Sequence, residues 1–69
     1  MLVKQLKEKL ANVKDDCEVI LSSDSEGNSY SPLSSIYKAF YEPDNSFSGE
    51  ITDEKSNTSK NCLVLYPIH

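Results

Sequence analysis

The stretch SSDSEGNSYSPL, residues 22–33, is the part of the chain that comes closest to a ligand-binding motif. Asp24, Glu26 and Asn28 alternate there, as the first oxygen ligands of a calcium-binding loop do. The rest of such a loop is missing, because the twelfth position holds Ser35 instead of a bidentate glutamate. We therefore expect a polar loop whose Ser and Asx side chains hydrogen-bond to its own backbone, without a bound metal.

Cysteine and histidine, which commonly act as nucleophile and base, are few. Cys17 and Cys62 both lie in apolar runs, where a free cysteine usually packs as a small hydrophobic side chain. His69 is the single histidine and the last residue, and a chain terminus seldom holds a catalytic base in a fixed geometry. With no CxxC pair and no spaced histidine pair, the sequence predicts a protein that is not an enzyme and has no cofactor.

Charge is distributed unevenly along the 69 residues, whose net charge is -4. Residues 1–14 carry four lysines and one glutamate, whereas residues 15–54 carry ten acids and one lysine. Arginine is absent, although its planar guanidinium is the usual bidentate partner of phosphate and guanine. We therefore expect no direct contact with nucleic acid, and the acidic 15–54 segment would instead suit a basic protein surface.

The elements that position these residues follow from the spacing of apolar side chains. Leu2, Leu6, Leu10 and Val13 recur three or four residues apart, which predicts an amphipathic helix over residues 1–13. Three strands follow from period-two alternation, β-branched content or a continuous apolar run, at residues 17–21, 35–41 and 62–68.

A short edge strand is expected at residues 47–51. Residues 52–61 contain no apolar residue, so a mobile polar loop is expected there. The segment 62–68 is the most apolar, so we expect it at the centre of the sheet, covered on both faces. The predicted fold is α+β: one N-terminal amphipathic helix packed on a small, mainly antiparallel sheet of three to four strands. Residues 1–69 are expected to form a single small domain.

One helix covers only one face of such a sheet, so the other face needs a partner. Alternation along 35–41 predicts that aromatic rings point to both faces, and exposed tyrosines ringed by carboxylates make a good protein-binding surface. A homodimer through the sheet would also add stability to so small a chain. The residues expected to bind a partner are Tyr37, Tyr41, Asp24, Glu26, Glu42 and Asp44.

The frame VKQLKEKLANVKDDCEVILSSDSEGNSYSPL…YEPDNSFSGE…CLVLYPIH resembles a family of short uncharacterised bacteriophage proteins. In that family a helix rich in Leu, Lys and Glu leads to an acidic residue–Ala/Cys–Glu–Val–Val strand and an S-S-D-x-E-G-N loop. The family ends in an apolar strand with a hydrophobic-Pro close, like Leu65-Tyr66-Pro67-Ile68 here. The resemblance covers most of the chain and implies a phage origin, but it carries over no catalytic residue.

With that origin, the expected function is that of a small acidic accessory protein that acts by protein–protein binding. Inhibition of a host nucleic-acid-processing or defence protein would be the consequence. One alternative is a structural or assembly accessory of the virion, and another is a small-ligand or metal-binding module that uses the 22–33 loop. Neither a signal peptide nor an apolar run of membrane-spanning length is visible, so we expect no membrane contact and a cytoplasmic location in an infected bacterial host.

Overall fold

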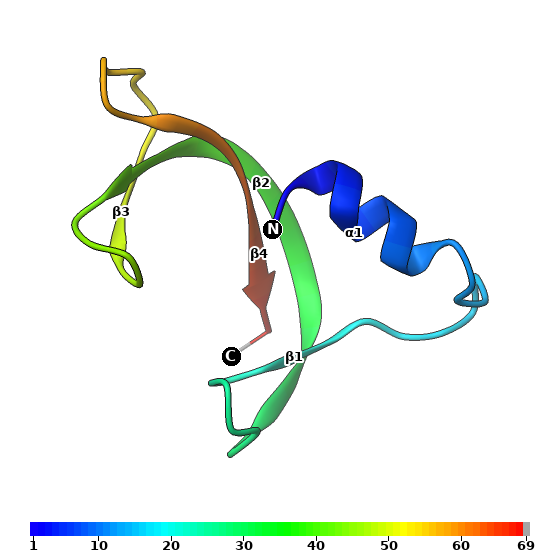
Figure 1. Cartoon of the computed structure of the whole chain (residues 1–69). Helices are drawn as coiled ribbons and strands as arrows, with labels where there is room; N and C mark the ends of the chain where they lie inside the picture. Colours follow the sequence, from blue (N-terminus) through cyan, green and yellow to red (C-terminus); the bar gives the residue numbers. More distant parts are fainter. Residues whose placement is uncertain (69) are drawn as a thin grey trace. The chain divides into compact units, whose positions relative to one another are not determined.

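A computed structural model describes residues 1–68 of the chain (Figure 1). The structure has one helix and an antiparallel four-stranded sheet, and it confirms the predicted α+β fold class. In chain order the elements are α1 (Val3–Leu10), β1 (Ile20–Ser22), β2 (Tyr30–Pro43), β3 (Gly49–Thr52) and β4 (Lys60–Pro67).

The chain divides into two compact units. Unit 1 consists of Met1–Leu33 together with the end of the chain from Pro67, and unit 2 consists of Ser34–Tyr66. Unit 1 contains α1, β1 and the start of β2, whereas unit 2 contains the rest of β2, all of β3 and most of β4. Each unit is described by itself below, and the single domain expected over 1–69 stays a prediction.

Strand β2 is the centre of the sheet, because it pairs with each of the other strands. Its first residues pair antiparallel with β1, where Ser31 lies opposite Leu21, and its last residues pair with β3, where Tyr41 lies opposite Ile51. Among residues 1–68, the strand neighbour of β4 is β2 alone. The expectation that the most apolar strand lies at the centre is therefore wrong, since apolar composition reports covered faces and not the number of paired edges.

Strand β2 is also longer than the predicted 35–41, because it begins at Tyr30 and runs through Pro32. A proline is tolerated in a strand where its missing N–H is not needed. The carbonyl oxygen of Pro32 still accepts a hydrogen bond from the Ile68 N–H at 3.0 Å, and the N–H of Leu33 donates to the Val19 oxygen at 3.0 Å. The loop expected over 22–33 is consequently reduced to residues 23–29.

Helix α1 spans eight residues and is shorter than the predicted 1–13. At its start, the Gln5 side-chain oxygen accepts a hydrogen bond from the backbone N–H of Leu2 at 2.7 Å, which satisfies one of the donors left unpaired at a helix start. Of the predicted apolar stripe, Leu6 is half-buried, whereas Leu10 is 50% exposed. Turns follow in place of the last predicted helical turn.

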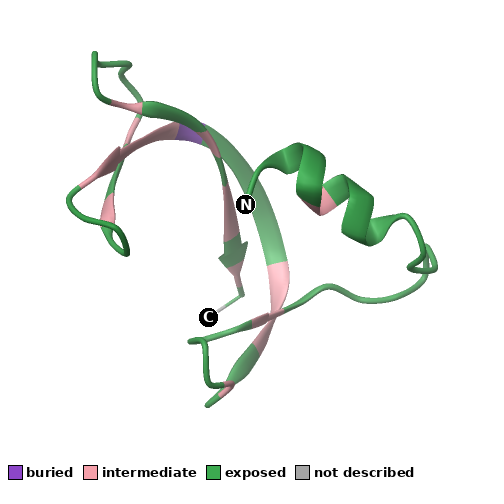
Figure 2. Cartoon of the chain, in the orientation of Figure 1, coloured by how far each residue is buried: buried purple, intermediate pink, exposed green. Residues whose placement is uncertain are grey.

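The core is thin. Ala39, near the middle of β2, is the one hydrophobic residue among the described ones that counts as buried, with 9% of its surface exposed (Figure 2). Phe40 and Tyr41, which follow it on β2, are half-buried, as are Val64 and Leu65 on β4. Because so little apolar surface is buried, unit 2 depends strongly on close contacts between its strands.

One such contact lies at Gly49, at the start of β3. A Cβ atom at Gly49 would come within 2.5 Å of the Glu42 carbonyl oxygen and 2.7 Å of the Tyr41 ring. Real Cβ atoms do not approach backbone so closely. The glycine therefore lets the Tyr41 ring lie across β3, as aromatic rings do when they cover strand glycines.

We expect Gly49→Ala to destabilise the protein by about 1–3 kcal/mol, the usual cost of forcing an extra methyl group into a packed site. Thermal unfolding followed by circular dichroism measures this. Ser46→Ala, at an exposed position in the adjoining hairpin loop, is the matched control and should leave the melting temperature unchanged. Equal melting curves for Gly49→Ala and the wild type would contradict the close packing of Tyr41 on β3.

Candidate functional site

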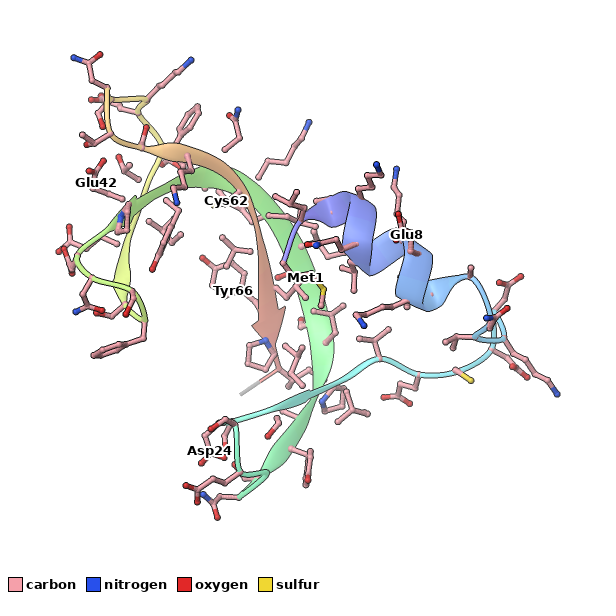
Figure 3. The ribbon with its side chains drawn as sticks, in the orientation of Figure 1. Met1, Glu8, Asp24, Glu42, Cys62 and Tyr66 are labelled. Carbon is pink, nitrogen blue, oxygen red and sulfur yellow. The ribbon has the colours of Figure 1, made fainter. Side chains whose placement is uncertain are left out.

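The six residues expected to bind a partner belong to different units. Asp24 and Glu26 lie in the β1–β2 loop of unit 1. The other four, Tyr37, Tyr41, Glu42 and Asp44, lie on β2 or directly after it in unit 2. Figure 3 labels one acid of each group, Asp24 and Glu42. The two groups are described separately.

Asp24 organises the loop between β1 and β2. Its Oδ1 accepts hydrogen bonds from the backbone N–H groups of Glu26, at 2.9 Å, and Asn28, at 3.2 Å. Its Oδ2 accepts one from the Asn28 side-chain amide at 2.6 Å. These bonds, chiefly the one from the Asn28 side chain, lower the pKa of the Asp24 carboxyl below its ordinary value. The loop thus satisfies its own backbone through an Asx side chain, as predicted.

The same loop contains the one glycine with a left-handed backbone, Gly27, whose φ is 75°. A side chain there would be strained, and its Cβ would also collide with the Tyr30 hydroxyl. The tight turn at Gly27 therefore brings Asn28 back to Asp24 while Tyr30 lies over the glycine. Asn28, directly after it, does not have a positive φ.

This arrangement leaves little for a ligand. Both oxygens of Asp24 already accept hydrogen bonds from the loop, and within residues 1–68 no group of three His, Cys, Asp or Glu side chains could hold a metal ion. A hollow also lies beside α1, but all of its lining residues are exposed. They are Met1, Gln5, Glu8 and Lys9.

Glu42 forms the second polar cluster, in unit 2. Its Oε2 accepts a hydrogen bond from the Ser56 hydroxyl at 2.8 Å, and its Oε1 accepts one from the Thr58 hydroxyl. The two hydroxyls, that of Thr58 first, lower the pKa of the Glu42 carboxyl below its ordinary value. We call Glu42, Ser56 and Thr58 the Glu42 clasp, because it fastens the β3–β4 loop to the end of β2.

The sequence did not reveal the clasp. Residues 52–61 were expected to be a mobile polar loop, and nothing in their composition indicates that Glu42, far away in the sequence, accepts hydrogen bonds from two of their hydroxyls. A second bond supports the loop from within, since the Ser56 N–H donates to the Ser59 hydroxyl at 2.9 Å. The carboxylate of Glu42 is thus occupied within the chain.

The two tyrosines of β2 have different surroundings. Tyr41 is half-buried against Gly49, whereas Tyr37 is 51% exposed. Asp44 is exposed at the start of the β2–β3 hairpin, which it helps to close by donating its backbone N–H to the Ser48 oxygen at 2.9 Å. Of the four residues in unit 2, Tyr37 and Asp44 are therefore the most accessible to a partner.

The cysteines differ from the expectation of buried packing. Cys17 is exposed in a turn, where its N–H donates to the Lys14 oxygen at 3.1 Å, because β1 begins only at Ile20. Cys62 on β4 is half-buried, and both thiols are free. His69, which was expected to have no catalytic role, lies outside the described residues.

Comparison with known proteins adds no relative. No protein-family model, no curated protein and no solved structure matches the chain. The resemblance to short bacteriophage proteins therefore stays a prediction. Within the described part of the chain, no helix has the length and apolar content needed to cross a membrane.

We expect Asp24→Ala to loosen the β1–β2 loop. Amide hydrogen exchange should become faster at Glu26 and Asn28, because both N–H groups lose their acceptor. Asp44→Ala, which removes an exposed carboxylate from another loop, should leave exchange at these two amides unchanged. A saturable calcium-dependent shift of the same amides in the wild type would contradict a loop whose acceptor oxygens serve its own backbone.

The clasp predicts a pH dependence. The folded pKa of Glu42 is lowered, so its hydrogen bonds stabilise the fold above the unfolded pKa, and this contribution is lost as the pH falls through the folded pKa. Thr58→Val should raise the pKa of Glu42 toward its ordinary value, as measured by NMR titration of the side-chain carboxyl. Thr52→Val is the matched control, because the Thr52 hydroxyl accepts a bond from the Glu54 N–H and is not part of the clasp. An unchanged Glu42 titration in Thr58→Val would contradict the clasp.

Proposed function

We propose that the protein acts by binding another protein through the aromatic face of unit 2. We define this face as Tyr37, Tyr41 and Ile51, since Tyr41 lies opposite Ile51 and the alternation of β2 puts Tyr37 on the same side. The observation that carries the proposal is exposure: Tyr37 is 51% and Ile51 44% exposed, whereas Ala39, which the same alternation puts on this face, is the only buried hydrophobic residue described. Exposed aromatic and aliphatic side chains on a sheet are typical of protein-binding surfaces.

Charge favours a basic partner. Unit 2 holds five acids and three lysines, and four of the acids stay exposed. They are Asp44, Glu50, Asp53 and Glu54. A protein that binds nucleic acid offers a complementary basic surface, so attraction at a distance would speed the encounter and the aromatic face would then hold the complex.

The biological consequence follows from what such a partner does. A chain bound to the nucleic-acid site of a nuclease, a polymerase or a defence protein blocks access of DNA or RNA to that site. The resemblance to short phage proteins supports a bacterial host protein as the target. The lack of arginine supports a protein, and not the nucleic acid itself, as the direct partner.

Co-precipitation from bacterial lysate tests this function. The wild type should retain a basic protein at low salt and release it at high salt, and Tyr37→Ser should reduce the retention about tenfold or more, as loss of an aromatic anchor does. Phe47→Ser is the matched control, because Phe47 is 87% exposed but lies in the hairpin loop outside the aromatic face.

The mechanism is tested with the purified partner. Duplex DNA should compete with the protein for it, because both would occupy the same basic surface. Retention of the partner by Tyr37→Ser at the wild-type level would exclude the aromatic face. Simultaneous binding of DNA and the protein would exclude the blocking mechanism while leaving the binding face in place.

A further inference from the structure

We propose that the outer edge of β4 pairs with the same edge of a second copy of the chain, so that two sheets join into one. Strand β4 spans eight residues, and its strand neighbour within residues 1–68 is β2 alone. One of its two edges therefore presents backbone N–H and C=O groups that no neighbouring strand pairs. Such an edge is a ready template for another strand.

The backbone groups at this edge follow from one hydrogen bond. The N–H of Ile68, directly after β4, points to the Pro32 oxygen of β2. Successive residues of an antiparallel strand point their N–H and C=O groups to opposite edges. Tyr66 and Val64 therefore face β2, whereas Leu65 and Leu63 face outward.

Pro67 agrees with this assignment. In the same alternation its backbone nitrogen falls on the outward side of β4. Proline is accepted in strands where the N–H position faces away from a neighbouring strand, which is the edge position. A proline at this position is therefore compatible with an outer edge that no strand of the chain pairs.

Between its two end residues, Lys60 and Pro67, β4 lacks the features that normally prevent strand association. Natural proteins protect their edge strands with charges, prolines, bulges or very short length. Residues 61–66, NCLVLY, carry no charge and no proline, and Leu63 and Tyr66 are 36% and 43% exposed. The other outer strands are shorter, since β1 has three residues and β3 has four.

A second copy is the occupant that fits this edge. An antiparallel strand is complementary to itself across a two-fold axis, and two copies of net charge -4 approach most easily where neither carries an acid. Residues 60–68 contain no acid and one lysine. A small chain with one buried hydrophobic residue also gains stability from such a union.

Geometry fixes the register. In an antiparallel pair, residues that exchange hydrogen bonds must face each other across the shared edge. With Leu63 opposite Leu63 of the second copy, Asn61 lies opposite Leu65, and Pro67 falls beyond the last pair. Moving the axis to Val64 would place Asn61 opposite Pro67, where one N–H is missing. The dimer is therefore centred on Leu63, and it does not depend on the proposed binding function of Tyr37.

Two measurements on the full chain test this edge. Sedimentation from micromolar to millimolar protein should show a monomer–dimer equilibrium. Amide hydrogen exchange at Leu63 and Leu65 should be unprotected in dilute protein and protected in concentrated protein. Exchange at Val64 and Tyr66 should be slow at both concentrations, because these groups face β2 in the monomer as well.

A pair of variants separates the edge from other surfaces. Leu63→Lys places two lysines directly opposite each other in the dimer, and it should weaken association about tenfold. The lysine stem can replace the partly exposed leucine in the monomer, and an unchanged circular dichroism spectrum checks this. Ile51→Lys changes an exposed residue of β3 and should associate as the wild type does.

The proposal is overturned by a wild type that stays monomeric at millimolar concentration. It is overturned equally by a dimer in which the Leu63 and Leu65 amides stay unprotected, or one that Ile51→Lys disrupts and Leu63→Lys does not. If Leu63→Lys does not fold, the exchange measurement on the wild type decides alone.

Discussion

Within residues 1–68, all pairing in the sheet involves β2, so the backbone hydrogen bonds of one fourteen-residue strand hold the other three strands in place. Its first residues meet β1 and its last residues meet β3. The only buried hydrophobic residue described, Ala39, lies on the same strand. With so little apolar burial, the fold depends on satisfied backbone groups and on close approaches such as that of Tyr41 to Gly49, more than on a packed interior.

Short-range polar acceptors take over part of the ordering that a larger core would provide. Each loop between strands contains a side-chain oxygen that accepts from backbone N–H groups a few residues further along or back. These acceptors are Asp24, Asn45, Thr52 and Ser59. The Glu42 clasp instead reaches across the sequence, and it uses both carboxylate oxygens to do so. Local bonds cost little chain entropy, which suits a chain that buries little surface.

The sequence predicted what local periodicity determines, namely the helix, the order of four strands and the Asx-stabilised loop at Asp24. It failed where tertiary pairing decides. Strand β2 passes through Pro32 because a neighbour needs only the carbonyl there, and local propensity cannot report that. The wrong strand was placed at the centre of the sheet, because hydrophobicity reports how far the faces of a strand are covered and not how many strands pair with it. The clasp was missed because the composition of a polar segment does not indicate that its hydroxyls donate to a carboxylate far away in the sequence.

Charge separates the two kinds of association proposed for this chain. A copy of the same molecule is repelled by the acids of residues 15–54, so it can approach closely only along a surface without them, and β4 is the longest strand that lacks an acid. The proposed basic partner would be attracted by those same acids and would then bind the aromatic face. The two surfaces use different groups, backbone N–H and C=O at the edge of β4 and side chains on the face of β2 and β3. One association therefore does not have to displace the other. A dimer would present two copies of the aromatic face to its target, and binding of the first copy would raise the effective concentration of the second.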